Sequence, residues 1–223
     1  MTKSPGGMLV VWLDSPTEKD HQINDWYNHE HVISRVVLPG FHWGKRYVAV
    51  EASPQYLAIY ATETLDVLSS DTYVHTIANP DAAEAENVMY FYNGTRALCE
   101  VVAEAGKFEG GIVGVLGVSG ADGQADALGT WLGDEVLPAL VKEYGVPAAR
   151  LLKSSQATVD AASCEYTPDD VRPPDWIIVA EATTPEAIEA ARQTHLSTTT
   201  LRAHGATNQQ RFGIYRMVLR VAD

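Results

Sequence analysis

The feature that most constrains the fold of this chain is an internal repeat, because one order of expected strands and helices occurs twice. In the first copy, apolar residues alternate or recur at helical spacing in six successive stretches. The expected elements are a strand at Met8–Leu13, a helix at Lys19–Val37, strands at Phe41–Val50 and Gln55–Thr62, a helix at Asp71–Ala78 and a strand at Gly94–Ala103.

The second copy has the same order, with elements expected at Ile112–Val118, Gln124–Tyr144, Ala148–Ser155, Trp176–Ala182, Pro185–His195 and Phe212–Val221. Each copy follows the β-α-β-β-α-β order of a ferredoxin-like unit, which predicts an α+β fold with two tandem units. We expect the units to span 1–106 and 107–223, with the glycine-rich stretch 105–111 between them. A loop insert rich in Asp, Pro and Ser is expected at 159–174, in place of a tight turn.

The first helices of the two copies share a scaffold and differ in their polar residues. The segment INDWYNHEHVISRV of the first copy aligns with LGTWLGDEVLPALV of the second, so that Trp26 matches Trp131 and Glu30 matches Glu135. Residues present in one copy only are better functional candidates than shared ones. The first copy has Tyr27, Asn28, His29, His31 and Arg35 where the second has Leu132, Gly133, Asp134, Val136 and Leu140. The chemistry is therefore expected in the first half.

Two stretches of the first half, DWYNHEHV and LPGFHWGKRY, resemble the dimeric α/β-barrel superfamily and most closely its EthD-like branch. SSDTYVHTIANP is similar to the second helix of that branch, and His31 is the histidine that matches its motif. The resemblance implies that the two units form one α/β barrel with antiparallel sheets. Relatives include cofactor-free polyketide cyclases, lactone isomerases and small monooxygenases, while haem enzymes share the tandem layout, so the fold is better determined than the reaction.

An ideal helical wheel predicts which face of the first helix is buried. It places His29 and Glu30 within the apolar arc of Trp26, Ile33, Val36 and Val37, and it places His31 on the opposite side. We therefore expect His29 to be either a general acid/base tuned by a neighbouring carboxylate or a core histidine held by one hydrogen bond. His31 is expected to be exposed or at an interface, with Arg35 as a candidate partner.

On the next strand, strict alternation groups His42, Gly44 and Arg46 on one face, and Phe41, Trp43, Lys45 and Tyr47 on the other. Arg46 on a mostly apolar face needs a negative partner, either Glu30 in a structural ion pair or an anionic group of a substrate. The first half is also rich in aromatic residues, which suits a planar ligand or simply core packing. The candidate substrate-binding residues are Trp26, Tyr27, Asn28, His42, Trp43, Tyr47 and Tyr73.

Several classes of protein and site are not expected. A net charge of −13 argues against nucleic-acid and polybasic membrane binding, and no apolar run is long enough to span a bilayer. With no signal peptide evident and only two cysteines, we expect a cytoplasmic protein without a disulfide scaffold. No phosphate-binding loop or nucleophile elbow occurs, and His29-Glu30-His31 lacks the spacing of a metal motif. No cofactor or metal is expected, and His195 is the one candidate for a haem ligand.

These patterns predict a cofactor-independent enzyme that acts on a small aromatic or enolisable, polyketide-like molecule by histidine acid/base catalysis. A lyase, cyclase or isomerase is expected, and a cofactor-free monooxygenase is an alternative. His29, His31 and Arg46 are the predicted catalytic residues, with Tyr47, Asn28 or Arg46 holding a developing oxyanion. A non-catalytic small-molecule-binding protein and a haem- or metal-dependent enzyme of the same tandem fold are also compatible with the sequence. A homodimer is a possible assembly.

Overall fold

The strands of the chain close into one antiparallel barrel in the order β1-β3-β2-β8-β5-β7-β6-β4. The computed structural model describes residues 4–162 and 172–222. The strands are β1 (Gly7–Asp14), β2 (Phe41–Glu51), β3 (Tyr56–Thr62), β4 (Tyr92–Gly106), β5 (Ile112–Gly120), β6 (Ala148–Ser154), β7 (Trp176–Ala182) and β8 (Ala206–Ala222). The predicted α+β class with antiparallel sheets and a barrel is confirmed.

Both halves of the chain build this barrel. Within the first half β1 pairs with β3 and β4, and within the second half β5 pairs with β7 and β8. The halves meet where β2 pairs with β8 and where β4 pairs with β6. The barrel interior contains an apolar cluster that includes Val10 and Ile59 from the first half and Val115, Ile177 and Val179 from the second. Neither half encloses this interior without the other.

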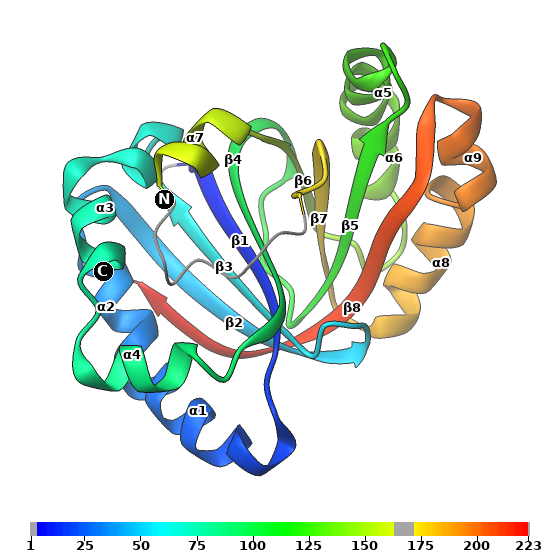
Figure 1. The fold of residues 1–223 in the computed structure, drawn as a ribbon. Coiled ribbons are helices and arrows are strands. Elements are labelled where there is room, and N and C mark those ends of the chain that lie inside the picture. The colour runs from blue at the N-terminus through cyan, green and yellow to red at the C-terminus, as the bar shows by residue number, and fades with distance from the viewer. Residues whose placement is uncertain (1–3, 163–171, 223) are drawn as a thin grey trace.

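Helices cover the outer face of the barrel in two groups (Figure 1). On the first-half strands lie α1 (Asp20–Trp26), α2 (Val32–Val36), α3 (Asp71–Ala78) and α4 (Ala82–Val88). On the second-half strands lie α5 (Ala125–Trp131), α6 (Leu137–Leu140), α8 (Pro185–His195) and α9 (Thr198–Ala203). Within the described ranges, the helices are all too short or too polar to cross a membrane.

The helix α7 (Gln156–Ala161) replaces the beginning of the predicted loop 159–174, so that part of the prediction is wrong. Ser155 caps it by accepting a hydrogen bond from the amide of Thr158. Although α7 follows β6, it packs against β4, and Ala162 is buried in the apolar cluster of the first half. Residues 163–171 of the predicted loop lie outside the described residues.

The first helix of each half contains a π-helical turn, Tyr27–His31 in one and Leu132–Val136 in the other. A π turn holds one more residue than an α turn, so side chains beyond it no longer follow an ideal α-helical wheel. As a result Val37 is 63% exposed, and His29 is exposed as well. The predicted burial of His29 is therefore wrong. His31, for which the wheel predicts an outward position, is turned toward the sheet.

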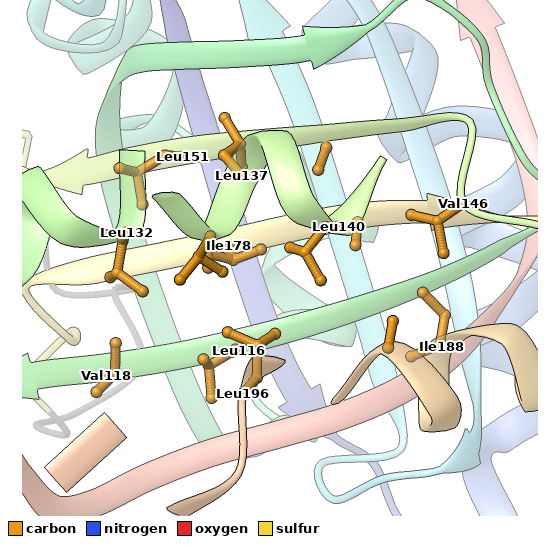
Figure 2. Close-up of a cluster of buried hydrophobic side chains, with 14 of the residues drawn as sticks. Leu116, Val118, Leu132, Leu137, Leu140, Val146, Leu151, Ile178, Ile188 and Leu196 are labelled. Carbon is orange, nitrogen blue, oxygen red and sulfur yellow. The ribbon is translucent and has the colours of Figure 1, made fainter. Parts of the chain in front are cut away.

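The second half is filled by apolar side chains between its helices and the barrel (Figure 2). Leu132, Leu137 and Leu140 reach down from the first helix of this half toward Leu116 and Ile178 on the strands. This packing is the ordinary core of a ferredoxin-like unit and serves as a reference for the first half.

Candidate functional site

A cavity lies in the first half between the outer face of the barrel and the helices α3 and α4. Its empty volume is about 680 Å³ when the open mouth is included. Much of its wall is apolar, with Leu9 and Val11 from β1 and Val88 and Phe91 at the α4 end. Its polar residues are Tyr27, His31, Arg35, Tyr60, Tyr73, Glu84 and Arg96.

His31 occupies the inner side of the π turn. Its side chain is 13% exposed, and its ring lies 4.6 Å from the ring centroids of both Trp26 and Tyr27. Burial, reinforced by the positive charges of Arg35 and Arg46, holds the pKa of His31 well below its ordinary 6.5. The imidazole is therefore neutral at neutral pH and can accept a proton from a bound molecule.

Beside His31, Arg35 and Glu84 form an ion pair that joins α2 to α4. Glu84 Oε1 also lies 3.6 Å from His31 Nδ1, and that nitrogen is buried without a hydrogen-bond partner within the described structure. Burial raises the pKa of Glu84, and the neighbouring Arg35 opposes this rise. The pair closes one side of the cavity with two charges that offset each other.

Arg96 on β4 brings a second cation to the cavity. It donates one hydrogen bond to the hydroxyl of Tyr73 at 2.9 Å and another to the carbonyl of Ala162 at 3.0 Å. Among the described residues, no carboxylate lies within ion-pair distance of Arg96. A guanidinium at this place in the cavity wall is suited to pair with a negative group of a ligand.

Tyr27 and Tyr60 complete the polar wall. Both are buried, and burial raises the pKa of Tyr27 and raises that of Tyr60 well above its ordinary value. Each phenol therefore stays protonated and can serve as a hydrogen-bond donor rather than as a base.

Arg46 lies behind Tyr27 and does not line the cavity. Its guanidinium lies over the ring of Tyr27 at 4.4 Å and that of Tyr56 at 4.8 Å, and it donates a hydrogen bond to Asn28 Oδ1 at 2.9 Å. The predicted ion pair with Glu30 is wrong because Glu30 is exposed on the outside of the π turn. Arg46 is 1% exposed, and its Nε and Nη2 atoms have no hydrogen-bond partner in the described part of the chain.

The structure brings only some of the predicted site residues together. Tyr27, His31 and Tyr73 line the cavity, Trp26 contacts His31, and Asn28 holds Arg46. His29 points away, with its side chain 74% exposed and its ring beside Asp25.

The predicted ligand contacts on β2 are not at this cavity. Trp43 and Tyr47 point into the barrel interior, and His42 does not line the cavity either. The pairing of β2 with β3 shifts register between Phe41 and Trp43, so strict alternation fails there. Phe41 consequently packs on the helix side, 5.6 Å from the ring of Tyr73, and not with Trp43 as predicted.

The second half has apolar residues at the positions equivalent to the polar wall. His31 and Arg35 match Val136 and Leu140. Tyr60 and Ala180 are equivalent positions in the two halves. Tyr60 pairs with Leu9 and Ala180 pairs with Gly114, and Leu9 and Gly114 are as far apart in the sequence as Trp26 and Trp131. By the same reasoning Arg96, opposite Val11, matches Phe212, opposite Leu116.

The equivalent space in the second half is correspondingly small, about 240 Å³, and Leu140, Ala180 and Phe212 line it. One fold thus occurs twice, with a cavity that has seven polar lining residues in one copy and a smaller space in which Arg192 is the polar lining residue in the other. Since the scaffold does not require the polar residues, they are the best candidates for function in the described chain.

Arg96 and Glu84 are functional candidates that the sequence patterns do not single out. Aligning the closing strands of the repeat would have found Arg96, which stands opposite Phe212 in that alignment. Glu84 lies in an acidic run after Pro80 that has no helical periodicity of apolar residues. The structure nevertheless forms the helix α4 there, and Asp81 caps it by accepting a hydrogen bond from the backbone amide of Glu84 at 2.8 Å.

Comparison with known proteins gives a fold. No family model and no curated protein sequence matches the chain. An anthrone oxidase-like protein of known structure superposes with a TM-score of 0.69 at 14% identity, over 97% of this chain and 92% of that one. The chain has the ferredoxin-like α+β barrel fold. A protein of Fusobacterium nucleatum assigned as a monooxygenase matches this barrel over 99% of the present chain and 96% of its own, with a TM-score of 0.61 and 8% identity.

A haem-binding protein of Thermus thermophilus has the same barrel, with a TM-score of 0.52 and 10% identity over 98% of this chain and 96% of its own. The one haem-ligand candidate here does not fit that role. His195 Nε2 is engaged at 2.8 Å with Glu143 Oε1 in an ion-pair contact on the second half. Among residues 4–162 and 172–222, no cluster of His, Cys, Asp and Glu is arranged to hold a metal ion.

Proposed function

We propose that this chain is an enzyme that moves a proton on a small aromatic or enolisable molecule bound in the first-half cavity, with His31 as the acid/base group. The observation that carries the proposal is a buried, neutral histidine among the polar residues of a largely apolar cavity, at a position that the second half fills with Val136. His29 lacks the burial that this role requires.

In the proposed reaction, His31 accepts a proton from an acidic C–H or O–H bond of the bound molecule. The electron pair of that bond passes into the conjugated system and increases the negative charge on the oxygen of the substrate. Arg96 and the hydroxyl of Tyr73 are placed to stabilise this charge in a largely apolar cavity. Return of the proton from His31 to another carbon of the same molecule would complete an isomerisation. In an elimination, the electron pair would instead expel a leaving group, which takes the proton from His31. In a cyclisation, the enolate carbon would attack a carbonyl carbon of the same molecule, and the oxygen of that carbonyl would take the proton.

The anthrone oxidase-like neighbour supports a substrate of this kind. Anthrone is a planar aromatic ketone with an acidic CH₂ group, and loss of one proton gives an enolate. Oxidation is the second candidate reaction, because the anthrone oxidase-like protein and the Fusobacterium nucleatum protein are both named for activities that use oxygen. In that branch the enolate reacts with O₂, and anthrone plus O₂ gives anthraquinone plus water. Proton removal by His31 is the first step of both branches.

Three finer assignments belong to this proposal. They are membership of the EthD-like branch, which rests on the motif around His31, a cytoplasmic location and a possible homodimer. A binding protein without turnover is the competing function, since a largely apolar cavity with a few polar groups also suits simple ligand capture.

Exchange of the CH₂ protons of anthrone for deuterium, followed by NMR under nitrogen, tests the proposal. We expect the protein to accelerate exchange, and we expect His31→Gln to lower the accelerated rate by about 10²-fold. Oxygen uptake in air then separates the oxidative branch from the others. Binding of anthrone without any acceleration would favour the binding protein and contradict the enzyme.

A further inference from the structure

We infer that Glu84 is a positioning residue for His31, one that keeps the proton of the neutral imidazole on Nδ1 and leaves Nε2 as the atom that accepts a proton. The inference deepens the proposed function and depends on it for its catalytic meaning. The tautomer itself can be measured whether or not the reaction is known.

The first observation is the environment of His31 Nδ1. This atom is buried, has no hydrogen-bond partner within the described structure, and lies 3.6 Å from Glu84 Oε1. A carboxylate repels the lone pair of an unprotonated nitrogen and attracts an N–H group. The Nδ1–H tautomer is therefore favoured, and a small approach of the two groups completes a hydrogen bond at about 3.0 Å.

The second observation is that Glu84 is held in place from two sides. Its backbone amide donates to the Asp81 carboxylate at the start of α4, and its own carboxylate accepts from Arg35. The helix α4 is in turn tied to α1, since Gln22 donates to Glu86 at 3.0 Å and to Asn87 at 3.4 Å. A carboxylate fixed in this way can orient a neighbouring ring.

The third observation is the charge balance around the histidine. Arg35 offsets the negative charge of Glu84, so this carboxylate can orient the ring without drawing a second proton onto it. His31 then combines a fixed Nδ1–H with an unprotonated Nε2, which is the state that a general base requires.

An ordinary structural ion pair between Arg35 and Glu84 makes a different prediction. In that case the carboxylate would hold α2 against α4, and its removal would lower stability without changing the histidine. The tautomer of His31 is thus a measurement that a purely structural role does not affect.

The test is ¹⁵N NMR of the full chain labelled at histidine, with the His31 ring signals assigned from their loss in His31→Gln. At pH 7.5 we expect the wild-type ring to show the Nδ1–H tautomer, although an unconstrained imidazole in water favours Nε2–H. In Glu84→Gln, which keeps the size of the side chain, we expect a shift toward Nε2–H. Glu30→Gln, an exposed change on the outside of the same π turn, should leave the tautomer as in the wild type.

The inference is overturned if wild-type His31 carries its proton on Nε2, a result that needs no folded Glu84 variant. It is equally overturned if Glu84→Gln retains the Nδ1–H form. In the exchange assay we expect Glu84→Gln to lower kcat by more than about tenfold with little change in KM. An Nδ1–H signal in a protein that catalyses no exchange would contradict the proposed function and leave the tautomer assignment standing.

Discussion

At the scale of single residues, the first half is distinguished by charged and phenolic groups in a place that the second half fills with leucine and valine. A buried cation or a neutral histidine costs folding free energy when nothing compensates it. Arg46 is compensated in part, by Asn28 and by the rings of Tyr27 and Tyr56, while two of its guanidinium nitrogens have no hydrogen-bond partner in the described structure. Its equivalent in the second half is Leu151, since Arg46 pairs with Ala58 and Leu151 with Ile178. The fold therefore does not require a cation there, and Arg46 contacts the cavity wall only from behind, through the ring of Tyr27.

The depressed pKa of His31 makes a prediction about stability. The folded chain keeps His31 neutral, while the unfolded chain takes up a proton as the pH falls below 6.5. The unfolded state then binds more protons, so stability decreases with falling pH. His31→Gln removes this contribution, and its free energy of unfolding relative to wild type should rise by up to about 1.4 kcal/mol per pH unit below 6.5.

Urea unfolding of both proteins between pH 7.5 and pH 5 measures this difference. The exposed variant His29→Gln serves as the control and should follow the wild-type curve. Parallel pH profiles for wild type and His31→Gln would show that the burial of His31 is not coupled to its protonation.

At the scale of elements, most of the fold could be predicted because strands and helices leave periodic patterns of apolar residues. The order of elements and the glycine ends of the first helices are of this kind, and Gly40 and Gly145 both have the positive φ that such ends require. The π turn could not be predicted, because Tyr27–His31 contains ordinary helix-forming residues and an extra residue in one turn leaves no compositional mark. That single residue reverses the predicted places of His29 and His31.

The two π turns provide a matched pair of deletions. Removing His29 should convert the first turn to regular α-helix, keep α1 and α2 in phase, and shift the ring of His31 relative to Glu84 and the cavity. Removing Asp134, the exposed equivalent in the second half, changes the same kind of turn far from the site. We expect each deletion to cost about 1–3 kcal/mol of stability.

Only the deletion of His29 should abolish proton exchange, and the two variants can be compared by thermal unfolding and by the NMR assay. Loss of exchange in both, at equal stability, would mean that the cavity is not the feature that matters. Retention in both would show that the π turn does not position His31.

At the scale of the whole molecule, the repeat and the barrel have different boundaries. The repeat divides the chain at 105–111, but the interior is shared, with Met8, Trp12 and Leu57 packed in one cluster with Val113 and Leu152. The halves meet through β2–β8 and β4–β6. These pairings could not be derived from periodicity, which is local, and were expected only from the resemblance of the first half to α/β-barrel proteins.

Separated halves test whether 1–106 and 107–223 are independent units. Each would expose the apolar face that lines the barrel interior, at about 1.5–3 kcal/mol for each large side chain. We expect neither to be a stable monomer and the two to assemble when they are expressed together. Size-exclusion chromatography and circular dichroism report the outcome, and a half that is monomeric and unfolds cooperatively would contradict it.

The most direct test of the central claim compares two histidines that are two residues apart. His31 lies in the cavity, and His29 lies on the surface of the same π turn. We predict that His31→Gln loses the acceleration of anthrone proton exchange and that His29→Gln keeps it, with both proteins folded. Equal rates in the two variants, or loss in His29→Gln alone, would contradict the assignment of acid/base chemistry to the first-half cavity.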